Sequence, residues 1–204
     1  MKKVDFREMR VLIDKAITYN DLAVARDLSK KALEAATFHE ALGERLYFMA
    51  QLAILDENFS EAMKYLDGAI RYNANDGAAY NDRALCMVEL GMLEGVIAYF
   101  DSGISVEPDF ATIHHNKGWF LNKTGRHREA IGCFHRALEL EPRRAVTYEN
   151  LADCLFNLGR MEEAIEAYQK ALAALEAHYV EIREQIEKLI KILRVIQSKK
   201  IREG

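Results

Sequence analysis

The chain has 204 residues, of which 50% are hydrophobic and 29% are charged, and its net charge at pH 7 is −4. This is the composition of an ordinary folded domain or small array with a real buried core, which excludes a disordered segment. The slightly acidic balance also lacks the basic footprint of a nucleic-acid-binding protein, so we expect no nucleic-acid partner.

The N-terminal stretch MKKVDFREMRVLIDKAITY starts with basic residues, as a signal peptide does. Asp5 and Glu8 interrupt it before any apolar run of the required length, and no A-x-A-like cleavage site follows. No uncharged run in the chain approaches the ~18 residues of a membrane helix. The three cysteines, Cys86, Cys133 and Cys154, form no CxxC pair, which favours reduced thiols. We therefore expect a cytoplasmic protein without membrane insertion.

A repeated unit dominates most of the sequence. Gly91, Gly125 and Gly159 are spaced 34 residues apart, as are Pro108 and Pro142. Three stretches carry the unit most clearly: NDRALCMVELGMLEGVIAYFDSGISVEP, HNKGWFLNKTGRHREAIGCFHRALELEP and ENLADCLFNLGRMEEAIEAYQKALAALE. Earlier copies lie in QLAILDENFSEAMKYLDGAIRYN and, in degenerate form and at an offset of 37 residues, in KAITYNDLAVARDLSKKALEAA.

Each unit reads as a pair of antiparallel helices. Small residues recur at matching places, where they allow the helix axes to approach to about 8 Å. In the first helix these are Ala50, Ala84, Gly118 and Ala152, and in the second Ala25, Ala62, Ala130 and Ala164, with Val96 as the exception. The repeated glycine stands where the first helix must end in a left-handed residue, and the repeated proline falls just beyond the second helix.

This series resembles the tetratricopeptide repeat, closely so over residues 43 to 176. The resemblance implies an all-α fold, a right-handed superhelix (α-solenoid) of antiparallel helix pairs, whose first helices line a concave groove and whose second helices form the convex back. We expect the following organisation: a degenerate helix pair that caps the N-terminus at 1–42, repeats at 43–76, 77–110, 111–144 and 145–178, and a C-terminal amphipathic capping helix with a basic tail at 179–204.

The C-terminal stretch is predicted to be a helix with one apolar stripe, formed by Ile182, Ile186, Leu189, Leu193 and Ile196. Packing of this stripe on the last repeat would hide the open face of the array. Other apolar residues of the stretch widen the surface, so a contact with a partner or a second copy remains an alternative. A continuous helix through ALAALEAHYVEIR also remains open. The basic residues of the tail are attributed to the helix dipole; they are Lys188, Lys191, Arg194, Lys199, Lys200 and Arg202.

The cluster IHHNKGWFLNKTG, residues 113–125, contains the paired histidines His114 and His115. The repeat register assigns His114 to a packing place between helices and His115 to the groove. Adjacent helical residues diverge by about 100°, and no acidic residue or cysteine stands three or four residues from His115, so we expect no metal site. Cys86 and Cys154 occupy equivalent packing places. We expect no catalytic residue and no cofactor, and hence no enzyme.

The family's register also implies which side chains line the groove. Asparagines at one repeated place would pair with the backbone of an extended peptide, because an amide offers both a donor and an acceptor. Trp119 would be a large apolar anchor unless it packs on a neighbouring helix. The predicted groove residues are Tyr47, Phe48, Gln51, Asn81, Asp82, His115, Asn116, Trp119, Lys123, Glu149, Asn150 and Asp153.

The carboxylate clamp found in Hsp70/Hsp90 co-chaperones is absent, because its early lysine would fall on Tyr47, Asn81 or His115. With acidic residues in the groove, neutral or basic peptides are favoured over an acidic C-terminus. The sequence therefore predicts a non-enzymatic adaptor or scaffold that binds an extended peptide segment of a partner protein. The alternatives are a self-assembling scaffold that forms a homo-oligomer through residues 179–204, and a secretion-type chaperone.

Overall fold

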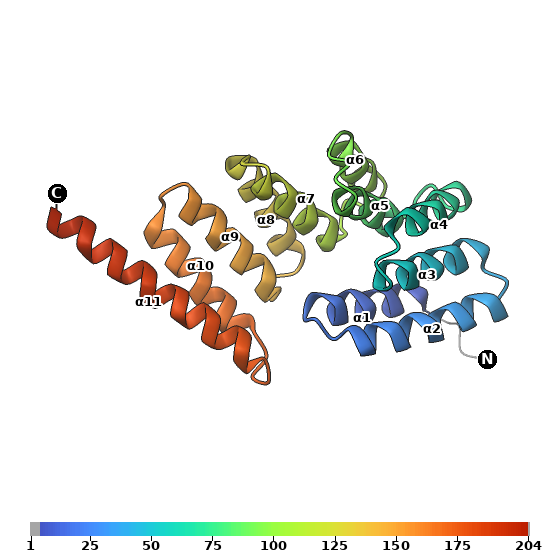
Figure 1. Cartoon of the computed structure of the whole chain (residues 1–204), viewed down its shortest axis with the longest axis horizontal. Helices are drawn as coiled ribbons and strands as arrows, with labels where there is room; N and C mark the ends of the chain where they lie inside the picture. Colours follow the sequence, from blue (N-terminus) through green and yellow to red (C-terminus); the bar gives the residue numbers. More distant parts are fainter. Residues whose placement is uncertain (1–4, 204) are drawn as a thin grey trace. The chain divides into compact units, whose positions relative to one another are not determined.

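The computed structural model describes residues 5–203, with the side chains of residues 5–198. All regular structure in this range is helical, in eleven helices without a strand, so the predicted all-α fold is confirmed (Figure 1). The chain divides into two compact units, Met1–Pro108 (unit 1) and Asp109–Gly204 (unit 2). None of the described helices is long and apolar enough to cross a membrane.

Unit 1 contains three pairs of sequential helices joined by short turns. The helices are α1 (Phe6–Thr18), α2 (Leu22–Phe38), α3 (Leu42–Leu55), α4 (Phe59–Tyr72), α5 (Gly77–Glu89) and α6 (Val96–Val106). Within unit 1, each helix packs on the helix that follows it, up to the packing of α5 on α6. The exception noted in the small-residue pattern, Val96, is the first residue of α6 and is fully buried, and Gly95 before it has a left-handed φ of 83°.

Unit 2 contains two further pairs and a long final helix. These are α7 (Ala111–Lys123), α8 (His127–Leu140), α9 (Ala145–Asn157), α10 (Met161–Ala174) and α11 (Val180–Glu203). Besides the contacts between sequential helices, the two first helices α7 and α9 touch each other directly. Their adjacent surfaces bring together residues that are one repeat apart in the sequence.

The turns inside the pairs have the predicted left-handed residue. Gly91, Gly125 and Gly159 have φ angles of 71°, 79° and 74°. Glu57, one period before Gly91, has a φ of 57° although its side chain makes this conformation unfavourable. The turn therefore keeps its geometry in a copy where the glycine is missing.

Close helix packing explains the small residue at position 118. A Cβ atom on Gly118 would lie 2.8 Å from Cε1 of Phe134 and 3.2 Å from the carbonyl oxygen of Ala130. Phe134 is fully buried on α8. The glycine in IHHNKGWFLNKTG thus lets α7 approach α8, as the sequence pattern predicted.

Helix α11 is separate from α10, because the chain turns at residues 175–179. Arg183 fastens this turn by donating from Nη2 to the carbonyl oxygen of Leu175 at 3.0 Å. The buried stripe consists of Ile186, Ile190 and Leu193. The stripe predicted from the sequence is thus partly wrong, since Leu189 is exposed and Ile190 is buried in its stead. The side chains of Lys199, Lys200 and Arg202 lie outside the described residues.

Candidate functional site

The predicted groove residues of unit 1 lie mostly in its interior. Tyr47, Phe48, Gln51 and Asn81 are each at most 5% exposed. Their assignment as surface contacts for a peptide is therefore wrong for this structure. Three of them instead hold Asp82, which accepts hydrogen bonds from Tyr47 Oη at 2.9 Å, Gln51 Nε2 at 2.5 Å and Asn81 Nδ2 at 2.8 Å.

Burial raises the pKa of Asp82 to about 6, although the three hydrogen bonds that it accepts act in the opposite direction. The negative charge of Asp14 on α1 contributes to the increase. Asp82 is thus a half-buried carboxylate that links α3 and α5, and we assign it a structural role.

Helix α1 covers the outer side of this cluster. The Arg10 guanidinium lies 3.8 Å from the centroid of the Tyr47 ring. It also donates from Nη1 and Nη2 to the two carboxylate oxygens of Asp76 at 2.6 and 2.8 Å, and from Nη2 to Glu44 at 2.9 Å. The ring of Phe6 contacts Phe48 with a centroid separation of 6.0 Å.

In unit 2 the paired histidines are both buried. His114 was predicted to pack between helices and does so. The prediction that His115 faces a groove is wrong, because this residue is only 6% exposed and its Nδ1 lies 3.0 Å from Oγ1 of Thr147. Burial lowers the pKa of His115 to about 3, and the nearby charge of Arg144 acts in the same direction. A neutral, enclosed imidazole does not contact a partner.

The remaining predicted residues of unit 2 stay accessible. Lys123 is exposed, and the others are half-buried on α7 and α9. We call this surface the α7–α9 face, and define it by Asn116, Trp119, Lys123, Glu149, Asn150 and Asp153. Asn150 uses one amide hydrogen within its own helix, from Nδ2 to the carbonyl oxygen of Val146 at 2.9 Å, which leaves its oxygen able to accept.

The α7–α9 face has two neighbouring acidic side chains. Partial burial raises the pKa of Glu149, and the charge of Asp153 contributes further. Burial likewise raises the pKa of Asp153, whereas the hydrogen bond from Tyr168 and the charge of Lys123 lower it. Among the described residues, Glu149 has no hydrogen-bond or ion-pair partner, and Trp119 has no hydrogen-bond or ring partner. The face thus combines an unpaired carboxylate with an aromatic side chain that retains exposed surface.

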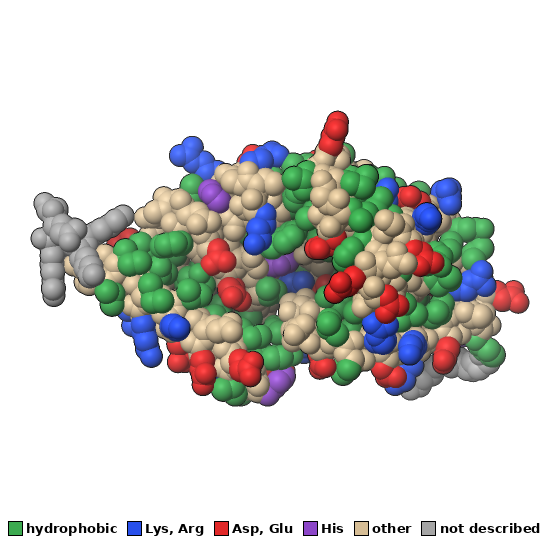
Figure 2. All heavy atoms as spheres, in the orientation of Figure 1, with side chains coloured by type: hydrophobic (Ala, Val, Ile, Leu, Met, Phe, Trp, Pro, Cys, Tyr) green, Lys and Arg blue, Asp and Glu red, His purple; other side chains and the backbone are tan. Residues whose placement is uncertain are grey.

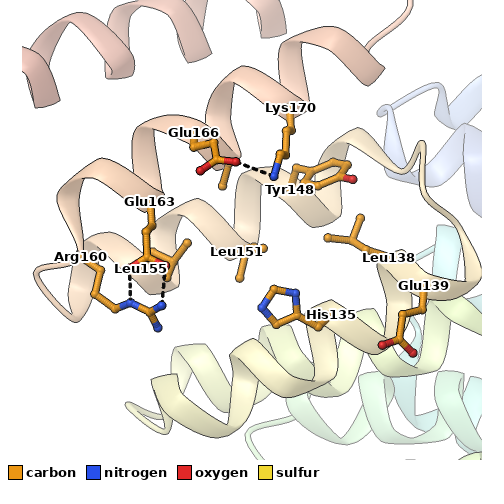
Figure 3. A pocket seen from close by; sticks show the side chains of 11 residues that line it. His135, Leu138, Glu139, Tyr148, Leu151, Leu155, Arg160, Glu163, Glu166 and Lys170 are labelled. Atoms are coloured by element: carbon orange, nitrogen blue, oxygen red, sulfur yellow. Dashed lines mark hydrogen bonds and ion pairs between the residues drawn. The ribbon is translucent and has the colours of Figure 1, made fainter.

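Apart from the α7–α9 face, a pocket with a volume of about 410 Å³ lies between α8 and α10 (Figure 3). Leu151 and Leu155 of α9 form its floor. The charges on its α10 side are paired locally, since Arg160 binds Glu163 and Lys170 binds Glu166. Because these charges are already neutralised, we prefer the α7–α9 face as the functional site.

No group of three or more His, Cys, Asp and Glu side chains that could hold a metal ion occurs among the described residues. Cys86 and Cys154 are buried free thiols, and burial raises the pKa of each to about 12. Thiols with such a high pKa are poor nucleophiles at neutral pH.

The helix pairs, their period and their left-handed turns define a helical-repeat protein. Residues 109–177 match the family model of the tetratricopeptide repeat. A 102-residue stretch is 28% identical to Hsp70-Hsp90 organizing protein 3 of Arabidopsis thaliana, covering 45% of this chain and only 18% of that protein. The chain is thus similar to tetratricopeptide repeat proteins.

Solved structures give the same fold. TTC0263, a thermophilic TPR protein of Thermus thermophilus, matches with a TM-score of 0.70 at 18% identity, over 94% of this chain and 100% of that one. YrrB, a TPR protein with an unusual peptide-binding site, matches with a TM-score of 0.58 at 18% identity, over 85% of this chain and 88% of that one. These similarities confirm the predicted solenoid class.

Proposed function

We propose that the protein is a non-enzymatic interaction module whose α7–α9 face binds an extended segment of a partner protein. The observation that carries this proposal is the combination of accessible Trp119 with unpaired Glu149 on two helices in direct contact. YrrB, which shares the fold, is a TPR protein with a peptide-binding site, and this supports a peptide as the ligand.

The chemistry of the face defines the segment that it would take. Asn116 and Asn150 stand at equivalent places of successive repeats, and their amide groups suit the backbone of an extended peptide. Trp119 offers a large apolar contact of the kind that dominates binding energy at interfaces. Glu149 and Asp153 favour a lysine or arginine side chain on the segment, because an opposite charge restores the ionised state that burial disfavours.

The similarity to an Hsp70-Hsp90 organizing protein does not extend to an acidic C-terminal ligand. The clamp needs basic side chains on successive first helices, and in unit 2 the corresponding places hold the neutral, buried His115 together with Thr112, Asn116 and Asn150. A carboxylate ligand would instead meet the acidic pair Glu149 and Asp153. We therefore propose a basic or neutral segment as the ligand.

A peptide array tests this proposal. Its members should share one extended backbone sequence with an apolar residue and differ only in carrying lysine, glutamine or glutamate. We expect the lysine peptides to bind best and to change the fluorescence of Trp119, which is the chain's single tryptophan.

Glu149→Gln should weaken the binding of the lysine peptides about tenfold, equivalent to ~1.4 kcal/mol, and Trp119→Ala should weaken the binding of all peptides in the array. Glu139→Gln, which changes an exposed carboxylate on α8 outside the α7–α9 face, serves as the control. Equal binding of all three peptide classes, or no effect of Glu149→Gln, would exclude this assignment.

A specific feature of α11 supports self-assembly as a second candidate function. Leu189, Ile192 and Val195 are 37%, 46% and 54% exposed on a helix whose other face is buried in unit 2. Apolar side chains gather on the visible surface over α11 and its neighbouring helices (Figure 2). A terminal helix that only capped the array would have a polar outer face.

Light scattering of the full chain and of an Ile192→Glu variant tests this second candidate. Association that depends on protein concentration and is lost in the variant would support it. A Glu184→Lys change, at another exposed position of α11, controls for altered charge alone. A monomer at all concentrations in both proteins would exclude it.

A further inference from the structure

We propose that unit 1 contains a second binding surface, which recognises an arginine carried on a helix, and that α1 occupies this surface as a built-in ligand. The surface is the arginine cradle, defined by Glu44, Tyr47 and Phe48 of α3 and by Asp76, the residue that caps α5. A partner helix with an arginine would compete with α1 for it.

The contacts of Arg10 are those of a recognised ligand group. Its planar guanidinium pairs with both oxygens of Asp76, a geometry that lysine cannot reproduce, and it stacks on the Tyr47 ring at 3.8 Å. Glu44 supplies a third oxygen at 2.9 Å. Asp76 is only 5% exposed, so this carboxylate depends on a cation for its charge balance.

A second element of recognition lies one helical turn before Arg10. Phe6 packs on Phe48, which is fully buried beneath it. Phe6 and Arg10 are four residues apart and therefore share one face of α1. The arginine cradle consequently recognises a helix that has an aromatic or large apolar residue and, four positions later, an arginine. A helix of another protein could carry the same pattern.

Helix α1, which packs on α2, buries few of its own side chains. Only Ile13 and Ala16 of its 13 residues are buried, and Val11 and Leu12 on its outer side are 54% and 45% exposed. An isolated helix of this length is marginal in water. The turn to α2 passes through Asn20, a residue with a left-handed φ of 61°.

The fit of Arg10 is also incomplete. Its Nε is buried without a hydrogen-bond acceptor, although most buried polar groups in folded proteins are paired. A helix with few buried apolar contacts and an imperfectly satisfied anchor is suited to exchange with a competitor. While α1 occupies the arginine cradle, the cradle is free in only a small fraction of the molecules. The apparent affinity for an external ligand is lowered by that fraction.

The test uses the full-length chain and a labelled synthetic peptide with the sequence of residues 5–20, DFREMRVLIDKAITYN. A Phe6→Ala/Arg10→Ala protein, whose own α1 is weakened, should bind this peptide at least about tenfold more tightly than the wild type, because the competing helix is lost. A peptide with alanine at the position of Arg10 should not bind.

The control protein Val11→Ala/Leu12→Ala, changed on the outer side of α1, should bind the peptide as the wild type does. Equal affinity of the wild type and the Phe6→Ala/Arg10→Ala protein, or equal binding of both peptides, would refute the proposal.

Hydrogen exchange of the wild-type chain keeps the proposal testable if the double variant fails to fold. Amides of α1 should exchange much faster than those of α3, because α1 opens while the remainder of unit 1 stays folded. If α1 and α3 exchange together, α1 is an integral part of unit 1 and the proposal is wrong. This result would leave the assignment of the α7–α9 face unaffected, since that face lies in unit 2.

Discussion

Nδ1 of His115 on α7 lies 3.0 Å from Oγ1 of Thr147 on α9, and both side chains are buried. This contact joins the first helices of two successive repeats inside unit 2. The neighbouring ring of Phe134, 5.8 Å away between centroids, completes the apolar surroundings of the imidazole. A residue type that suggests catalysis or metal binding therefore has a packing role here.

The packing role predicts that His115→Ala destabilises unit 2. The change leaves a cavity beside Phe134 and removes the partner of the Thr147 hydroxyl, so we expect the free energy of unfolding to fall by about 2–3 kcal/mol. Urea unfolding followed by Trp119 fluorescence measures this loss. His178→Ala, at an exposed histidine of the same unit, should have almost no effect. Equal losses in the two variants would contradict the assignment.

His115 also predicts a pH dependence of stability. Its pKa in the folded chain is about 3, whereas a histidine in the unfolded chain titrates near pH ~6.5. Below pH ~6.5 the unfolded state therefore binds the additional proton, and stability falls as the pH decreases toward the folded pKa. In His115→Gln this part of the acid destabilisation should disappear, while His178→Gln should retain it. Unfolding curves between neutral and mildly acidic pH compare the two.

Asp82 predicts the opposite dependence for unit 1. Its folded pKa is raised to about 6, so the folded state binds the proton more tightly than the unfolded state, and stability decreases as the pH rises through 6. Asp82→Asn, which is neutral at all pH values, should remove this decrease. Amide exchange of α3 and α5 at mildly acidic and mildly alkaline pH reports it for unit 1 alone. An unchanged pH dependence in the variant would show that the Asp82 carboxylate does not titrate in this range.

The sequence period predicted those features that depend on contacts within one helix pair. The left-handed glycines and the small residue at 118 are of this kind, because a turn and a close helix approach act on residues near in sequence. The burial of His115 depends on Thr147, which is 32 residues away, and its own place in the helix does not reveal this contact. Similarly, the choice between Leu189 and Ile190 on α11 depends on how that helix rotates on α10, which a stripe of apolar residues does not define uniquely.

The burial of the predicted groove residues of unit 1 beneath α1 was the least predictable feature of the structure. The repeat register assigns Tyr47 and Phe48 to the groove, and both are apolar enough to serve as peptide contacts. They are buried because Phe6 and Arg10 of α1 lie on them, and Arg10 pairs with Asp76 at a separation of 66 residues. A degenerate repeat with few sequence landmarks gave no signal for that contact.

The packing of α7 on α8 predicts opposite results for two glycines of one helix pair. Gly118→Ala should lower the free energy of unfolding by about 1–3 kcal/mol, because the new Cβ would overlap the Phe134 ring and the backbone at Ala130 has little freedom to move. Gly132→Ala on α8 should raise it by about 0.5–1 kcal/mol, since open space surrounds this position and alanine favours the helix. Urea unfolding of the two variants compares these effects directly. If both variants gain stability, the close contact at Gly118 does not exist in solution.

The left-handed turns predict a stabilising substitution in unit 1. Glu57 has a φ of 57°, so Glu57→Gly should relieve backbone strain and raise the free energy of unfolding by about 0.5–1 kcal/mol, even though glycine increases the entropy of the unfolded chain. Glu57→Ala removes the same side chain but keeps the Cβ, and should bring no such gain. Conversely, Gly91→Ala, in a turn of the same unit with a φ of 71°, should cost about 1 kcal/mol. Far-UV circular dichroism during thermal unfolding measures all three. A gain in Glu57→Ala equal to that in Glu57→Gly would mean that the charge of Glu57, and not its backbone conformation, destabilises the turn.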